Sequence, residues 1–268
     1  MLCAHRTIVA KRMNVTLQRF MYRHGWDTRS RNALPARLLR PILTKVREDG
    51  RAVLLDVGCG SPGLASLLTD VSIVGVDLEA PTALMPNVKF QLGSILALPF
   101  PDRAFPVVAC IDVLEHLPEE DRSRAVCELV RVASKAVLIA CPHGKTAQES
   151  DETFRRVSIK YRRPLPSWVI EHLQHPYPTA PAMTEYVQQA ASPARNPNLS
   201  LRYCETAAVT RLVRSVAARS DLLYGFVNLL AGVLSSLLPL PGARGSYRMV
   251  LLAELSEAEQ SGSAQPAQ

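Results

Sequence analysis

The sequence predicts an α/β protein with a doubly wound, mostly parallel sheet. Near-continuous apolar runs, such as AVLLDVG and AVLIACP, recur from residue 52 onward, which is the pattern of strands covered by helices on both faces. Helix-like segments alternate with these runs and imply right-handed crossovers between parallel strands. The 268 residues, 47% of them hydrophobic, are enough for one large α/β domain with a buried core.

Seven strands are expected in all. Five belong to the parallel part and two close the domain, at 52–58, 71–77, 88–93, 106–113, 136–142, 199–205 and 246–255. A helix is expected over 118–134, because Pro118 stands near its start, acids fill its first turn and apolar residues share one face. A second, basic helix is expected over 206–220.

The N-terminal residues 1–47, with eleven Lys or Arg residues and a single acid, Asp27, are expected to form a basic helical arm. One interpretation is an amphipathic helix that lies on the domain or on an anionic membrane surface. The other is an organellar targeting segment, because the arm is rich in Arg and poor in acids.

The rest of the chain divides by composition. Residues 48–145 form the cofactor-binding core, and 146–198, rich in Pro, aromatic residues and His, are expected to be a substrate cover or loop region. Residues 199–256 complete the sheet and contain the uncharged segment 222–238, and 257–268 are a disordered tail. At 17 residues, segment 222–238 is at the lower limit for spanning a bilayer. We therefore expect a buried or interface helix, with peripheral membrane contact as the alternative.

The six cysteines include no CxxC pair and no Cys/His cluster at zinc-ligand spacing. This predicts a reducing, cytoplasmic environment, no disulfide and no metal site.

The stretch DVGCGSPG carries the spacing Gly58-x-Gly60-x-x-Gly63, which is often associated with dinucleotides. Asp56, however, stands two residues before the first glycine, where a carboxylate would repel a pyrophosphate. A donor with cationic groups and no phosphate suits this acid better, and S-adenosylmethionine is such a molecule. Asp77 ends the next strand and can accept both ribose hydroxyls of either cofactor; the alternative role is a helix N-cap.

Four stretches in order, LLDVGCGSPG, VGVDLE, GSILALPFPDRAF and VVACIDVLEHLPEEDR, resemble the motifs of class I S-adenosylmethionine-dependent methyltransferases. The resemblance covers about residues 50–145 and implies the Rossmann-like methyltransferase fold. It also implies a set of cofactor-binding residues: Asp56, Gly58, Cys59 and Gly60 at the methionine end, Asp77 at the ribose, and Leu78, Ser94, Ile95, Ile111 and Asp112 around the adenine and the far side of the cofactor.

Three residues depart from the family pattern. Pro62 replaces a glycine of the loop and removes an N–H donor. Ser94 stands where the family commonly has an Asp, and Pro106 replaces the Asp of the motif FDVV. The departures at Pro62 and Ser94 favour weaker cofactor binding.

Methyl transfer to a hydroxyl needs a base close to the acceptor. His116 and His143 follow the fourth and fifth strands at the sheet edge where ligands bind, and are the catalytic candidates. Helix capping or packing is the alternative for His116. In WVIEHLQHPYP, the residues Trp168, His172 and Tyr177 are candidates for the wall of the acceptor pocket, with simple helix packing as the alternative.

These observations favour an S-adenosylmethionine-dependent methyltransferase acting on a small molecule, with segment 222–238 pointing to an apolar or lipid-linked acceptor. The sequence carries no motif of base-amino methylation after the fourth strand, so no sequence-specific nucleic acid is expected as a partner. Two alternatives stay open. One is a non-catalytic methyltransferase-like binding protein, and the other is an NAD-dependent oxidoreductase.

Overall fold

The structure is a computed structural model that describes residues 26–46, 54–60, 63–81, 84–191, 195–219, 223, 226–228, 230–231 and 245–256. Several regions singled out in the sequence lie outside these residues: 1–25 of the basic arm, Pro62, most of segment 222–238, and the predicted disordered tail 257–268.

The described helices and strands follow the expected order along the chain. They are α3 (Trp26–Lys45), β1 (Leu54–Val57), η1 (Leu64–Ser66), β2 (Ile73–Asp77), β3 (Val88–Leu92), β4 (Phe105–Ile111), η2 (Leu114–His116), α4 (Glu119–Val132), β5 (Ala133–Pro142), α5 (Gly144–Lys160), α6 (Ser167–His172), α7 (Ala180–Ala190), β6 (Pro197–Thr206), α8 (Ala207–Ala217) and β7 (Ser246–Leu255).

One seven-stranded sheet organises the molecule, in the order β3-β2-β1-β4-β5-β7-β6. The strands from β3 to β5 are parallel, and β7 runs antiparallel to both of its neighbours. The predicted doubly wound, mostly parallel seven-stranded fold is therefore confirmed. Pro106 lies where the β4–β5 pairing becomes irregular, as expected for a residue that has no N–H to donate.

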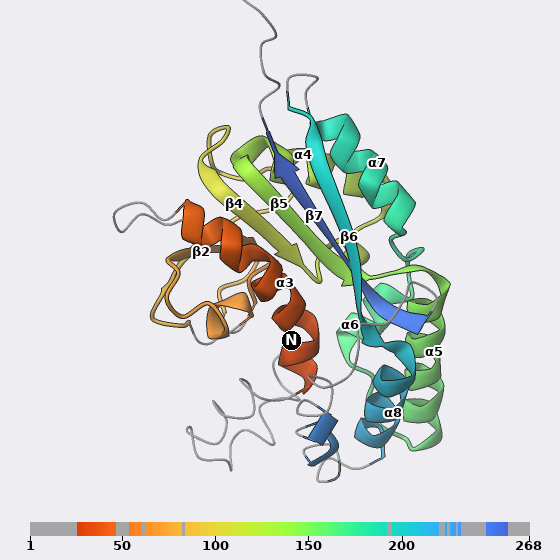
Figure 1. Ribbon diagram of the computed structural model, residues 1–268. Coiled ribbons are helices and arrows are strands. Elements are labelled where there is room, and N and C mark those ends of the chain that lie inside the picture. Colours follow the sequence, from red (N-terminus) through yellow and green to blue (C-terminus); the bar gives the residue numbers. More distant parts are fainter. Residues whose placement is uncertain are drawn as a thin grey trace, which may run out of the picture.

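Helices cover both faces of the sheet (Figure 1). On one face α3 buries Leu34, Leu39 and Leu43 against β1, β4 and β5. On the other face α4 and α7 pack on a second core. The part of the basic arm that the structure describes is thus a helix lying on the domain, as one of the two interpretations of the arm predicts.

The crossovers near β1 are shorter than the prediction required. Between β1 and β2 the described residues contain only the three-residue 3-10 helix η1, and between β2 and β3 they contain no helix. No α-helix therefore begins directly after Gly63, where a dinucleotide site would place the helix N-terminus that holds the pyrophosphate.

The region 146–198, expected to be a substrate cover or loop region, is mainly helical. It contains most of α5 and all of α6 and α7. The sequence pattern does not reveal α5 because the stripe that this helix buries is partly polar and includes Ser150, Asp151 and Ser158. Helices α5, α6 and α8 gather at the carboxyl end of β5 (Figure 1).

Candidate active site

The loop after β1 is built by glycines in conformations that other residues rarely adopt. Gly58, Gly60 and Gly63 have φ values of 73°, 47° and 35°. A Cβ on Gly58 would lie 2.1 Å from Cγ2 of Val113, so the loop packs directly against the segment that follows β4. Only glycine fits at position 58.

Asp56 lies beneath this loop and is 5% exposed. Burial, and secondly the nearby carboxylate of Asp77, raise the pKa of Asp56 to about 7. The same burial, with Asp56 and then Asp77, raises the pKa of the Cys59 thiol to about 12. The site therefore concentrates negative charge that a bound cation would relieve.

Asp77 holds the loop from the neighbouring strand. Its Oδ2 accepts a hydrogen bond of 3.0 Å from the backbone N–H of Gly60, and its Oδ1 accepts one of 2.7 Å from Leu78. A carboxylate has further lone pairs, so both oxygens can still accept from a ligand. The Leu78 side chain is 71% exposed.

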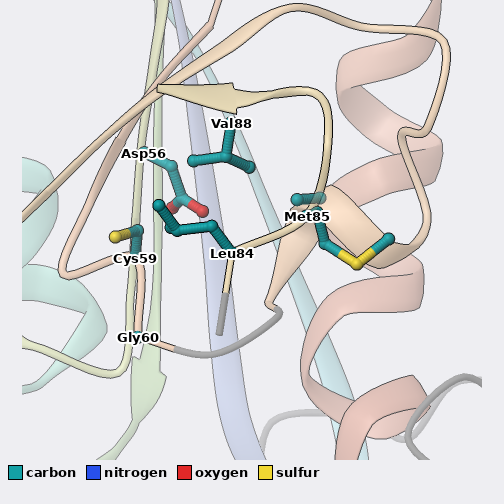
Figure 2. A pocket seen from close by; sticks show the side chains of 7 residues that line it. Asp56, Cys59, Gly60, Leu84, Met85 and Val88 are labelled. Atoms are coloured by element: carbon teal, nitrogen blue, oxygen red, sulfur yellow. The ribbon is translucent and has the colours of Figure 1, made fainter. Parts of the chain in front are cut away.

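A small pocket adjoins Asp56, and Figure 2 shows the side chains that line it. Cys59 and Gly60 form one side, while Leu84 and Met85, from the connection between β2 and β3, form the other.

The remaining predicted cofactor residues lie after β3 and β4. Ser94 begins a tight turn in which its hydroxyl accepts the N–H of Leu96 at 3.2 Å, and Ile95 is buried. Ile111 ends β4.

Asp112 follows β4 with a φ of 59°. Its carboxylate pairs with Arg248 of β7, and at 3.4 Å with Arg31 of α3. Arg248 also donates to Glu205, at 3.1 Å. Asp112 is therefore held by two arginines remote in sequence, which the motif alone did not indicate.

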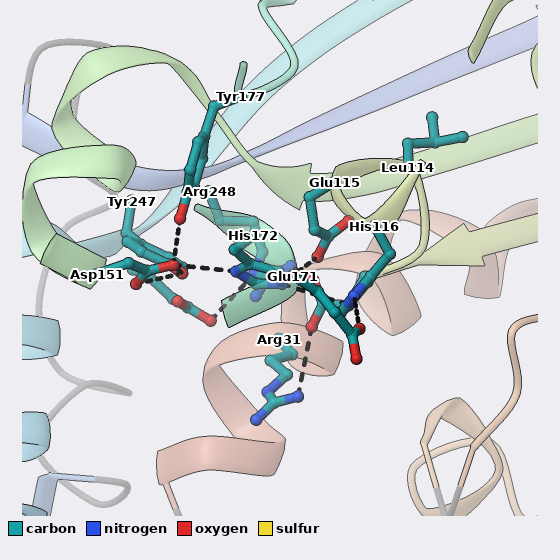
Figure 3. Close-up of polar contacts among 12 residues, drawn as sticks. Arg31, Leu114, Glu115, His116, Asp151, Glu171, His172, Tyr177, Tyr247 and Arg248 are labelled. Carbon is teal, nitrogen blue, oxygen red and sulfur yellow. Dashed lines mark hydrogen bonds and ion pairs between the residues drawn. The ribbon is translucent and has the colours of Figure 1, made fainter. Parts of the chain in front are cut away.

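A second polar cluster lies beside η2 and is centred on Asp151 of α5, which is fully buried (Figure 3). The carboxylate accepts from Tyr177 at 2.5 Å, from Tyr247 at 2.9 and 3.0 Å, and pairs with Arg214. Although burial opposes it, Arg214 and the hydrogen bonds from His172 and Tyr177 lower the pKa of Asp151, so this carboxylate is ionised.

His172 connects Asp151 to the end of β4. Its Nδ1 lies 2.9 Å from Oδ2 of Asp151, and its Nε2 lies 3.2 Å from Nε2 of His116. His116 in turn places Nδ1 2.8 Å from Glu171. Burial, and secondly His172, lower the pKa of His116.

Glu115 completes this cluster and is 1% exposed. Burial raises its pKa to about 8. The thiol of Cys110, in β4, lies near both sites: its pKa is raised by burial and then by the carboxylates of Glu115 and Asp56. The loop after β1 and the histidine cluster therefore share one neighbourhood at the sheet edge.

The other two candidate residues, His143 and Trp168, have contacts of their own. His143 forms a 2.8 Å contact with Ser246 and lies against the ring of Tyr203, and burial lowers its pKa. Trp168 stacks on Phe154 with Arg214 over its ring. Its ring thus packs between helices, and its edge contacts the ring of His172 at a centroid distance of 5.2 Å.

The sequence did not single out Asp151, Arg214 or Tyr247. Asp151 falls on the buried stripe of α5 with Ala147, Phe154 and Ser158, which becomes visible only once the helix is known. A charged residue on such a stripe indicates a buried partner.

Among the residues that the structure describes, no helix is long and apolar enough to cross a membrane. The described parts of segment 222–238 expose Leu223, Phe226 and Leu230.

Comparison with known proteins gives consistent matches to the strands and loops just described. Residues 55–141 match the model of a methyltransferase domain. Over 105 residues the chain is 34% identical to ajmaline N-methyltransferase of Rauvolfia serpentina, covering 34% of this chain and 35% of that protein. Over 135 residues it is 27% identical to 2-methyl-6-phytyl-1,4-hydroquinone methyltransferase of Synechocystis, covering 46% and 40%.

The matched stretches span less than half the length of these relatives. A solved structure of an S-adenosylmethionine-dependent methyltransferase from Archaeoglobus fulgidus aligns with 90% of this chain and all of its own, at 14% identity and a TM-score of 0.47.

Proposed function

We propose that the chain is a class I S-adenosylmethionine-dependent methyltransferase that transfers a methyl group from this donor to a small-molecule acceptor. The match of residues 55–141 to the model of a methyltransferase domain supports this proposal. The donor binds at the carboxyl ends of β1, β2 and β4, and the acceptor enters beside η2 and α6.

One observation carries the donor assignment: the paired carboxylates of Asp56 and Asp77 at a glycine loop that no α-helix N-terminus follows. An ammonium or sulfonium group offsets this negative charge, whereas a pyrophosphate would add to it. The arrangement favours S-adenosylmethionine over NAD, and it supports the choice of donor made from the motif.

Each cofactor residue then has a role. Asp56 faces the cationic methionine end, Gly58, Cys59 and Gly60 let the backbone approach it, and Asp77 accepts from the ribose hydroxyls. The exposed side chain of Leu78 covers the adenine. Ser94, Ile95 and Ile111 border the adenine, and Asp112, fixed by its arginines, shapes the far wall.

The acceptor assignment rests on the histidine cluster. His116 is partly exposed at the sheet edge and lies three residues from Val113, against which Gly58 packs. His172 orients it, and Asp151 with Tyr177 orients His172. This arrangement supports a group that can take up an acceptor proton close to the proposed donor site, whereas His143 is engaged with Ser246.

An apolar acceptor is favoured within the small-molecule class. Two relatives are named for acting on an alkaloid and on a phytyl hydroquinone. Leu223, Phe226 and Leu230 are exposed at helical spacing. We assign these side chains to contact with an apolar acceptor or the lipid surface that carries it.

The reaction is an in-line displacement. A lone pair of the acceptor oxygen or nitrogen forms the bond to the methyl carbon as the bond from carbon to sulfur breaks, and the sulfonium becomes a neutral thioether. The protein contributes alignment, exclusion of water and removal of the acceptor proton.

The test is transfer of tritiated methyl groups from S-adenosylmethionine to an extract of small molecules and lipids, followed by identification of the labelled product. We expect labelled product with the wild-type chain and clearly less with Asp77→Asn when the donor concentration is below saturation. No label with any fraction, while the protein binds S-adenosylhomocysteine, would instead indicate the non-catalytic alternative.

A further inference from the structure

Three side chains with lone pairs converge beside the sheet edge: Glu115 and His116 from η2, and His172 from α6. One ligand atom of each lies within 4.8 Å of the other two. Figure 3 shows the three side chains together, with Glu171 and Asp151 on the outer sides of the two imidazoles. Residues 116 and 172 are too far apart in sequence for any metal-ligand spacing, so the prediction of no metal site could not test this group.

Among the described residues, the three ligand atoms have no hydrogen-bond donor between them. Nδ1 of His116 faces the carboxylate of Glu171, and Nδ1 of His172 faces that of ionised Asp151. A carboxylate only accepts, so both Nδ1 atoms carry the proton and donate it. In the neutral imidazoles both Nε2 atoms are then acceptors, and they face one another at 3.2 Å. Two lone pairs at that distance repel unless a cation lies between them.

Glu115 adds a third acceptor without a donor. Within the described part of the chain, neither of its carboxylate oxygens has a hydrogen-bond partner, and one lies 3.8 Å from Nε2 of His172. Burying a carboxylate without a partner is costly. All three atoms therefore call for positive charge at the same point.

We propose that Glu115, His116 and His172 bind a divalent first-row transition-metal ion, with Zn²⁺ the best fit. Two imidazoles and a carboxylate are a common zinc ligand set that leaves a coordination position open. Tetrahedral ligands at zinc distances are separated by about 3.3 Å, close to the separation of the two Nε2 atoms. Glu171 and Asp151 are the outer carboxylates that orient metal-bound histidines in such sites.

The site has an open side. The side chains of His116 and Glu171 are 29% and 40% exposed, while Glu115 and His172 are buried. An ion and an acceptor can therefore reach the cluster from the direction of His116.

Resting on the proposed function, this site narrows the acceptor to a molecule with a hydroxyl group. With the ion bound, a hydroxyl oxygen in the open position would lose its proton more readily to solvent. Its lone pair then attacks the methyl carbon as described above. With the ion bound, His116 would be a ligand that positions the acceptor, and it would no longer be the group that takes up the acceptor proton.

The experiment measures metal binding by the full chain. The protein is dialysed against a chelator and then titrated with Zn²⁺ and with Co²⁺, whose absorption spectrum reports coordination by nitrogen and oxygen. We expect one ion per chain. Glu115→Gln, which keeps the side-chain shape, should weaken Zn²⁺ binding by about 100-fold, and Glu171→Gln by about 10-fold. His175→Gln, which changes a nearby histidine outside the cluster, should leave it unchanged.

Two results would overturn the proposal. One is the absence of a stoichiometric ion on the folded wild-type protein, which would mean that the two histidines share a proton instead. The other is an equal affinity for Zn²⁺ in the wild type and in Glu115→Gln. If Glu115→Gln does not fold, His116→Asn is used in its place, because the His116 side chain is partly exposed. An affinity for Zn²⁺ equal to that of the wild type would again overturn the proposal. Binding of S-adenosylhomocysteine in the chelator, measured in parallel, tests the donor site alone and so separates failure of this proposal from failure of the proposed function.

Discussion

The donor site and the histidine cluster lie close together but are built in different ways. The proposed donor site is made of consecutive short motifs between residues 56 and 112. Backbone N–H groups of its loop donate to the carbonyl of Val76 and to the carboxylate of Asp77. The cluster brings together residues from η2, α5, α6, α8 and β7 through buried side-chain contacts. The proposed donor site is therefore encoded mainly by local motifs, apart from Asp112, which Arg31 and Arg248 hold. The histidine cluster depends on the packing of the whole C-terminal half.

The strongest test of this contrast is Asp151→Asn. The change leaves Arg214 buried without its carboxylate and removes an acceptor from two tyrosines and His172. We expect a loss of about 3–5 kcal/mol in the free energy of unfolding, measured by urea denaturation. In the native protein at low temperature, affinity for S-adenosylhomocysteine should stay within about threefold.

The matched control is Glu152→Gln, the adjacent carboxylate, which pairs with Arg155 on the surface at 2.7 Å. It should change stability little. A loss of donor affinity in Asp151→Asn as large as its loss of stability would mean that the two sites are not independent.

The converse change is Gly58→Ala. The new Cβ would overlap Val113, and the φ of 73° is strained for alanine. We expect binding of S-adenosylhomocysteine to be abolished in calorimetric titrations, while the Zn²⁺ affinity of the cluster falls less than tenfold.

Gly144→Ala separates the two causes, because Gly144 has a φ of 60° but a Cβ added there would meet no atom within 4 Å. It should cost only about 1 kcal/mol of stability from backbone strain and leave donor binding intact. Equal effects of the two substitutions would show that contact with Val113 is unimportant.

The contrast also explains which features could be predicted from the sequence. The apolar runs predict the strands, although β3 and β6 are only partly buried. The residues proposed to bind the donor follow strand ends that the same runs mark. Asp56 and Asp77 could therefore be found without a structure.

The remainder depends on contacts between distant residues. Glu115 stands beside the predicted candidate His116. The sequence does not show that Glu115 is buried next to His172, because that contact forms only when α6 packs against η2. Helix α5 could not be predicted because buried Asp151 and Ser150 interrupt its apolar stripe. The missing helix after Gly63 could not be anticipated, since the loop motif is usually followed by one.

A smaller effect is expected for Asp77→Asn. The amide can still accept one hydrogen bond but loses the negative charge that strengthens bonds to the ribose and to Gly60. Affinity for S-adenosylhomocysteine should fall by about 10- to 100-fold by calorimetry, with an unchanged Zn²⁺ affinity. Wild-type affinity for S-adenosylhomocysteine in this variant would remove Asp77 from the site.

The smallest expected effect is a pH dependence of donor binding. Asp56 has a pKa of about 7 in the free protein, and a cationic ligand binds best to its ionised form. Affinity for S-adenosylhomocysteine should therefore rise by up to about tenfold from pH 6 to pH 8, and Asp56→Asn should abolish the rise. Glu115→Gln is the control, because Glu115 is the other carboxyl group whose pKa is raised. This variant should retain the rise in affinity with pH.

The stability of the protein is expected to change with pH in the opposite direction to its affinity for the donor. Because the folded pKa of Asp56 exceeds its unfolded value of about 3.9, its contribution to stability is present below pH 4 and is lost as pH rises through 7. Asp56→Asn should thus be the more stable protein at pH 8, and the less active one. A variant with wild-type stability at every pH from 4 to 8 would contradict the raised pKa.

The most direct test is a pair of titrations of the wild-type chain, one with S-adenosylhomocysteine and one with NAD, at pH 8. The account predicts that one molecule of S-adenosylhomocysteine binds per chain, with a dissociation constant in the micromolar range, and that NAD does not compete at millimolar concentration. Saturable binding of NAD, with no heat from S-adenosylhomocysteine, would contradict the assignment of Asp56 and Asp77 to a cationic, phosphate-free donor.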